Sequence, residues 1–185
     1  HLDDIDRYKL LYLPLPIMLT QATSKRLAGW VAAGGCLVSE GCPAYFGDHG
    51  HVGTVQPNHG LDTVFGGRER YVEFTPDILD DLTLTVSGKA LRGSTYLQAY
   101  EPQAGTAVGW YADGRVAALE HSHGKGKTLL IGTMVGAGYG FAPSEEGRAW
   151  FRSLLDWAGV AQHARTDDAA VTVRLHRGPT GRLYL

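Results

Sequence analysis

The sequence has few of the features that mark several large classes of protein. Its two cysteines, Cys36 and Cys42, are too few for a disulfide framework, so we expect reduced thiols and a cytoplasmic protein. No apolar run reaches the roughly 18 residues of a membrane-spanning helix, and we expect no membrane partner. The formal net charge is only −2, with Lys and Arg scattered, which argues against nucleic acid as a partner.

The sequence also has no initiator methionine. It begins at His1 and stops at Leu185 inside an apparent strand, so we expect both ends to be cuts in a longer polypeptide. A chain of 185 residues suits one domain with a short piece of a second. Its 25 glycines follow no period, which indicates many turns rather than a fibrous protein.

The clearest pattern lies between residues 8 and 40. Residues 10–13 form a short apolar run ended by Pro14, which is typical of a strand covered on both faces. Residues 22–33 have helical spacing with Thr20 suited to the N-cap, and residues 36–38 form a second buried strand. This strand–helix–strand unit predicts an α/β fold with a mainly parallel sheet flanked by helices.

From residue 82 onward the pattern alternates. We expect residues 82–132 to add strands, partly antiparallel, to the parallel sheet. Asp113-Gly114 between two alternating apolar runs predicts a hairpin turn. Residues 133–141 are typical of a glycine-rich loop, and Ser144 opens the final helix.

The end of the chain suggests a second domain. Residues 171–175 and 183–185 alternate around the turn at 178–181, which predicts the first hairpin of a following β domain. We therefore divide the chain into a domain of residues 1–163 and the truncated start of a C-terminal β domain, residues 164–185.

Several stretches in this order resemble the middle domain of family-42 glycoside hydrolases, the bacterial β-galactosidases. They are YKLLYLP (8–14), LAGWVAAGGCLV (27–38), GLDTVFG (60–66), YADGRVAALEHSHGKGKTLLIGT (111–133), LLDWAGV (154–160) and VTVRLHRG (171–178).

The resemblance implies a flavodoxin-like, class I glutamine-amidotransferase-like three-layer sandwich that mediates trimer formation. The partners it implies are identical subunits in a homotrimer and the parent barrel domain. In this family the catalytic acid and nucleophile, both glutamates, lie in that barrel and correspond to no residue of this chain. We therefore assign no catalytic residue, cofactor or metal.

Cys42 supports a rival function. Amidotransferase-like folds place a nucleophilic cysteine on the turn after a buried strand, close to the position of Cys42. Such a cysteine needs a base, and residues 133–135 hold no histidine where one is expected. Pro43 also disfavours a helix that would lower the thiol pKa. A stand-alone amidotransferase-like hydrolase with Cys42 as nucleophile is the alternative, and we expect a structural thiol.

The histidines gather in one loop. His49, His51 and His59 lie there beside Asp48, and a His-x-His pair can supply metal ligands. No third ligand has a diagnostic spacing, so we interpret this loop as a polar surface or an interface.

Two other groups of polar residues have no clear partner. His121 and His123 lie near a strand end, and we expect them to face opposite sides of the sheet. Glu40, Glu101 and Glu120 each suit a strand end, but nothing in the sequence pairs two of them as sugar hydrolysis requires.

Apolar residues in the same loop point to an interface. Tyr45, Phe46 and Val52 lie in a Gly- and Pro-rich loop that should be wet, and aromatic residues there favour contact surfaces. We expect residues 43–60 to contact another subunit or the barrel. The interface candidates are Tyr45, Phe46, His49, His51 and Val52.

The leading function is thus a non-catalytic assembly domain of a β-galactosidase-like glycoside hydrolase active in carbohydrate metabolism. The Cys42 hydrolase is one alternative. A small sugar-binding module that uses the loop aromatics is the other.

Overall fold

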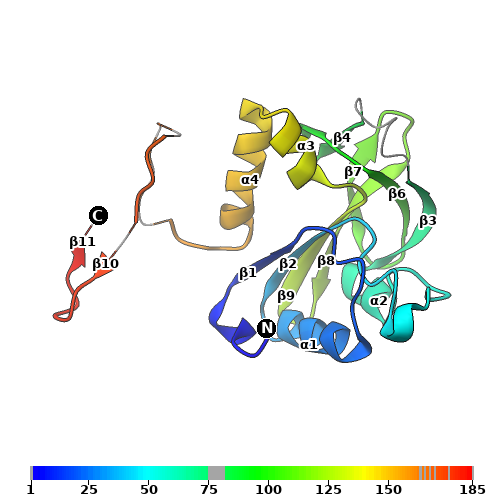
Figure 1. The fold of residues 1–185 in the computed structure, drawn as a ribbon, viewed down its shortest axis with the longest axis horizontal. Helices are drawn as coiled ribbons and strands as arrows, with labels where there is room; N and C mark the ends of the chain where they lie inside the picture. Colours follow the sequence, from blue (N-terminus) through cyan, green and yellow to red (C-terminus); the bar gives the residue numbers. More distant parts are fainter. Residues whose placement is uncertain are drawn as a thin grey trace.

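Three parallel strands form one end of the seven-stranded main sheet in the computed structural model (Figure 1). The structure describes residues 2–74, 82–162, 164, 166, 168, 170–174 and 176–184. Strand β2 lies between β1 and β9, and every residue of β2 is buried. The three strands are β1 (Leu10–Leu13), β2 (Cys36–Glu40) and β9 (Gly126–Ile131). The predicted strands are all present, and β2 and β9 are buried as expected, but β1 is a half-buried edge strand rather than one covered on both faces.

Four antiparallel strands extend this sheet beyond β9, in the order β1-β2-β9-β8-β7-β4-β5. They are β8 (Val116–His123), β7 (Thr106–Tyr111), β4 (Thr83–Val86) and β5 (Lys89–Arg92). The predicted Asp113-Gly114 turn joins β7 to β8. Because short turns join only antiparallel neighbours, the sheet is mixed, and the prediction of a mainly parallel sheet is corrected.

A separate two-stranded ribbon packs beside the sheet. It consists of β3 (Gly67–Phe74) and β6 (Tyr96–Pro102). Part of the stretch 82–132 thus pairs outside the main sheet, contrary to the prediction. A β-bulge between Glu69 and Tyr71 shifts the register of this ribbon.

Helices cover both faces of the parallel strands. The helices α1 (Gln21–Ala32) and α2 (Leu61–Phe65) lie on one face, and α3 (Val135–Phe141) and α4 (Glu145–Trp157) lie on the other (Figure 1). Single turns of 3-10 helix occur at Ile5–Arg7 and Asp48–Gly50. None of the described helices is long and apolar enough to cross a membrane.

The two long helices begin where the sequence indicates. The Thr20 side chain accepts a hydrogen bond from the Thr23 amide, and the Ser144 side chain accepts one from the Gly147 amide. Helix α3 is a correction, since residues 133–141 were expected to form a loop. Its four apolar and three glycine residues give little helical periodicity, so the helix depends on tertiary contacts.

Two hydrophobic cores hold the layers together, one on each face of the sheet. Trp150 and Leu154 of α4 pack with Val38 and Leu129 on one face. Leu27 and Trp30 of α1 belong to the core of the opposite face. This division follows from the alternation of side chains along each strand.

The chain after α4 leads away from the body (Figure 1). Its described residues include a short hairpin, β10 (His176–Arg177) paired with β11 (Leu183–Tyr184). A hairpin around residues 178–181 is present as predicted, but its first strand is His176–Arg177, and residues 171–174 form no strand. The division at residues 163 and 164 remains a prediction.

Candidate functional site

The candidate site lies at the carboxyl end of β2, where the chain makes a tight turn. Cys42 and Ala44 have φ values of 55° and 54°, in the left-handed region that non-glycine residues rarely adopt. Both residues are buried, and the Cys42 amide donates a 2.9 Å hydrogen bond to Gln98 Oε1. Packing and this hydrogen bond hold the unusual backbone in place.

A pocket of about 380 Å³ opens beside this turn. Two aromatic pairs shape its wall. The Tyr45 and Phe46 rings lie 5.5 Å apart, and the Phe74 and Tyr96 rings lie 5.0 Å apart. The pocket is lined by Ile17, Cys42, Tyr45, Phe46, Val72, Phe74 and Tyr96. We call it the aromatic pocket. Its residues come from four regions of the chain, so no local motif reveals it.

Gln98 organises the polar groups near the aromatic pocket. Its side chain is 0% exposed, and its Oε1 accepts hydrogen bonds from the Cys42 amide and the Tyr100 hydroxyl. Its Nε2 donates to the Glu69 carboxylate, while its backbone carbonyl accepts from the Tyr111 hydroxyl. Sequence analysis missed Gln98, because one glutamine in a strand carries no signal of such a network.

The Cys42 thiol is poorly suited to nucleophilic catalysis. Burial, together with the nearby Glu69 carboxylate, raises the pKa of Cys42 to about 12. The thiol therefore stays protonated at neutral pH, whereas nucleophilic attack needs the thiolate. No hydrogen bond to its sulfur is found among the described residues.

The apolar interface candidates differ in exposure. Phe46 forms isolated β-bridges with Met18 on one side and Val52 on the other. Met18 is 63% exposed and Val52 is 53% exposed, while Tyr45 and Phe46 are half-buried against the aromatic pocket. We call Met18, Phe46 and Val52 the apolar ribbon. Met18 was missed, because nothing in the sequence places it beside the loop.

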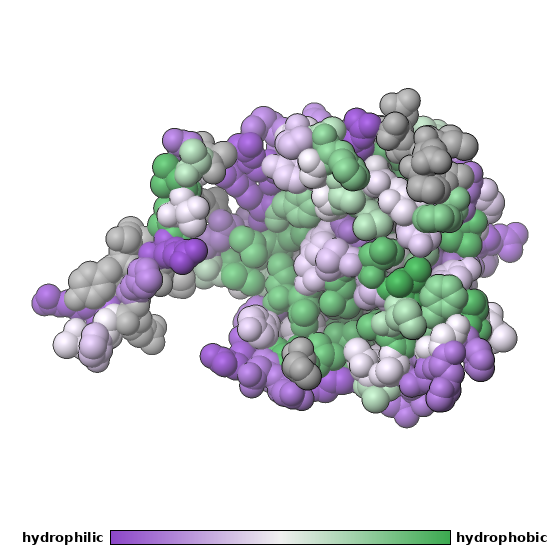
Figure 2. All heavy atoms as spheres, in the orientation of Figure 1, coloured by the Kyte–Doolittle hydropathy of each residue, from purple (hydrophilic) through white to green (hydrophobic). Residues whose placement is uncertain are grey.

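Apolar side chains gather on the face that carries these elements. Figure 2 shows them over the region of β3 and the neighbouring loop, and also in the hollow beside α4. Large exposed apolar patches of this kind mark contact surfaces.

Comparison with known families identifies this arrangement. The model of the β-galactosidase trimerisation domain matches residues 1–161. The chain belongs to this family. No curated protein sequence matches the chain.

Solved structures have the same fold as this trimerisation domain. A catalytic mutant of Gan42B, a GH42 β-galactosidase from G. stearothermophilus, has a TM-score of 0.78 and 22% identity over 94% of this chain and 25% of that chain. The β-galactosidase from Bacillus circulans sp. alkalophilus has a TM-score of 0.72 and 17% identity, covering 90% of this chain and 25% of that chain.

A third solved structure comes from an archaeon. The β-galactosidase from Halorubrum lacusprofundi has a TM-score of 0.68 and 23% identity, covering 83% of this chain and 22% of that chain. The chain thus spans about a quarter of the length of each of these β-galactosidases.

The histidine loop of the trimerisation domain is tied to α1. The Asp48 carboxylate accepts a 2.8 Å hydrogen bond from the Gln21 amide, and His59 Nε2 lies 3.7 Å from the same carboxylate oxygen. His49 and His51 are exposed. Among the described residues, no three His, Cys, Asp or Glu side chains group as metal ligands.

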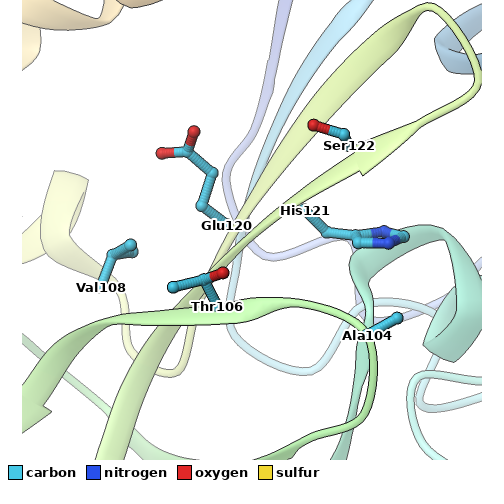
Figure 3. A pocket seen from close by; sticks show the side chains of 6 residues that line it. All are labelled: Ala104, Thr106, Val108, Glu120, His121 and Ser122. Atoms are coloured by element: carbon cyan, nitrogen blue, oxygen red, sulfur yellow. The ribbon is translucent and has the colours of Figure 1, made fainter.

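The prediction for His121 and His123 was wrong. Their rings lie 6.3 Å apart on the same side of β8, because residues two apart in a strand face the same way. His121 Nδ1 lies 3.0 Å from the Val64 carbonyl oxygen of α2. In Figure 3 the His121 ring and the Glu120 carboxylate point in opposite directions. Glu120 lines an open pocket of about 470 Å³.

Glu40 is a buried residue whose hydrogen bonds support the fold. Its carboxylate is fully buried and accepts hydrogen bonds from the Tyr12 hydroxyl and the Gly136 amide. Burial raises its pKa above the ordinary value. These contacts use Glu40 to connect β1, β2 and α3.

Proposed function

We propose that this chain is the non-catalytic assembly domain of a β-galactosidase-like glycoside hydrolase. It joins identical subunits into a homotrimer and adjoins a catalytic barrel that lies outside these 185 residues. The family match over residues 1–161 carries the proposal. The coverage of only about a quarter of the β-galactosidase chains supports a role distinct from the complete enzyme.

The apolar ribbon and its loop supply the proposed contact surface. Met18 and Val52 expose apolar side chains to water, and burying them against a subunit is favourable by about 25 cal/mol for each Å². His49 and His51 belong to the polar rim of this surface. A closed trimer needs two different patches on each subunit, so this surface meets a different region of its neighbour.

We also propose a finer fold type and a boundary for this domain. Helices on both faces of β1, β2 and β9 support a variant of the flavodoxin-like, class I glutamine-amidotransferase-like sandwich. The end of the family match at residue 161 supports a domain boundary at residues 163 and 164. A cytoplasmic location agrees with the free thiols of Cys36 and Cys42.

Double substitution of Tyr45 and Phe46 by serine tests the proposal. In the protein made from the full reading frame, we expect the substitutions to shift the mass from trimer to monomer in sedimentation velocity. The control is Trp110→Ser, which removes an exposed aromatic ring from β7. A Tyr45→Ser/Phe46→Ser protein that keeps the wild-type mass would refute this surface. A wild-type protein that is monomeric would refute the assembly function itself.

A further inference from the structure

A carboxylate, that of Glu69, lies on β3, the strand that supplies Val72 and Phe74 to the aromatic pocket. Side chains alternate along a regular strand, so Glu69 would face away from Val72 and Phe74. The bulge at Arg70 changes this, because Glu69 pairs with Tyr100, and Val72 pairs with Gln98. Glu69 therefore shares one face of the β3–β6 ribbon with the pocket residues Val72 and Phe74.

One side chain, Gln98, bonds both to Glu69 and to the amide of Cys42, which lines the pocket. The negative charge of Glu69 contributes to the raised pKa values of Cys42 and Tyr45, which both line the pocket. The Gln98 amide donates to its carboxylate and fixes the direction in which it points. Since Gln98 is fully buried, this support is rigid.

No cation compensates this carboxylate within the described part of the chain. Burial raises the pKa of Glu69. The hydrogen bond from the neutral Gln98 side chain has the opposite, smaller effect and lowers it. Removing a carboxylate from water without a cationic partner is unfavourable. A cation brought next to Glu69 would therefore stabilise its charged form.

The walls of the pocket add a second preference for positive charge. Tyr45, Phe46, Phe74 and Tyr96 present aromatic rings, whose faces attract ammonium and guanidinium groups. A neutral sugar can stack on such rings, but it leaves the Glu69 charge uncompensated. The combination of rings and one carboxylate favours a cation.

We propose that the aromatic pocket is a socket for an arginine or lysine side chain of an adjoining subunit. The inference rests on the proposed assembly function. Phe46 belongs to both the pocket and the apolar ribbon, so a subunit that covers the apolar ribbon also covers the pocket. The cation from that subunit forms an ion pair with Glu69 between the aromatic rings.

The test compares Glu69→Gln with Glu73→Gln in the protein made from the full reading frame. Glutamine at position 69 keeps an oxygen that accepts from Gln98, while Glu73 lies on the same strand and bonds to the exposed Tyr71 instead. Sedimentation at several concentrations gives the dissociation constant of the trimer. We expect Glu69→Gln to raise it about tenfold or more and Glu73→Gln to leave it unchanged. Equal unfolding midpoints show that both variants fold.

Competition identifies the chemistry of the occupant. Ethylguanidinium chloride should dissociate the wild-type trimer more than sodium chloride at the same ionic strength, and this difference should vanish in Glu69→Gln. Wild-type behaviour of Glu69→Gln, or competition by D-galactose in place of ethylguanidinium, would overturn the socket while leaving the assembly function intact. A monomeric wild-type protein would instead refute the assembly function, on which the socket depends.

Discussion

At the scale of single residues, Glu40 shows how a buried acid couples stability to pH. The hydrogen bonds from Tyr12 and Gly136 favour its charged form, but loss of solvent has the larger effect and raises its pKa. The folded protein therefore keeps the Glu40 carboxyl protonated at pH values where the unfolded chain has released that proton. The resulting stabilisation is present at low pH and is lost as pH rises through the folded pKa.

This linkage predicts the behaviour of Glu40→Gln. The wild-type protein should lose stability relative to the variant as pH rises above the ordinary glutamate value of 4.5, because only the wild type must bury a charge. Urea unfolding at a series of pH values measures the difference. Glu101→Gln, which removes an exposed glutamate of β6, should follow the wild type. A pH-independent gap between wild type and Glu40→Gln would contradict this account.

At the scale of elements, the sequence predicted those parts whose signals are local. Thr20 and Ser144 mark the starts of α1 and α4, and Asp113-Gly114 marks the β7–β8 turn. Helix α3 and the β3–β6 ribbon were missed, because their places depend on partners far along the chain. The aromatic pocket and the Gln98 network were missed for the same reason. Of the pocket residues, only Cys42, Tyr45 and Phe46 could be selected from the sequence.

The contact between β6 and the end of β9 joins two parts of the chain that lie far apart in the sequence. The backbone amide of Gln98 donates a 2.7 Å hydrogen bond to the carbonyl of Gly132, which directly follows β9. A Cβ at Gly132 would overlap the Gln98 carbonyl oxygen. This glycine therefore allows the ribbon to approach the main sheet, and it fixes the position of Gln98 beside Cys42.

Gly132→Ala should consequently lower the free energy of unfolding by about 2 kcal/mol or more, because two backbones must separate. Urea unfolding measures the loss. The matched control is Gly140→Ala in α3, where an added Cβ meets no atom within 4 Å. That substitution should be neutral or slightly stabilising, since alanine favours a helix. Equal stability of the two variants would show that the β3–β6 ribbon tolerates displacement at Gly132.

At the scale of the whole molecule, the body and the segment after α4 differ in how they are held. Trp150 of α4 is 2% exposed and belongs to the core on its face of the sheet, and Lys127 of β9 stacks on the Trp157 ring at 4.6 Å. A hydrogen bond of 3.5 Å from Arg152 to the Thr166 carbonyl is a much weaker link to the following segment.

This contrast predicts the outcome of two truncations. A chain of residues 1–163 should unfold at the same urea midpoint as the chain of residues 1–185, because the lost segment contributes little to either core. A chain of residues 1–143 should fail to fold, because it lacks Trp150 and Leu154, and losing one such side chain costs about 3–5 kcal/mol. Circular dichroism and urea unfolding measure both outcomes. A marked loss of stability in the 1–163 chain would place the domain boundary beyond residue 163.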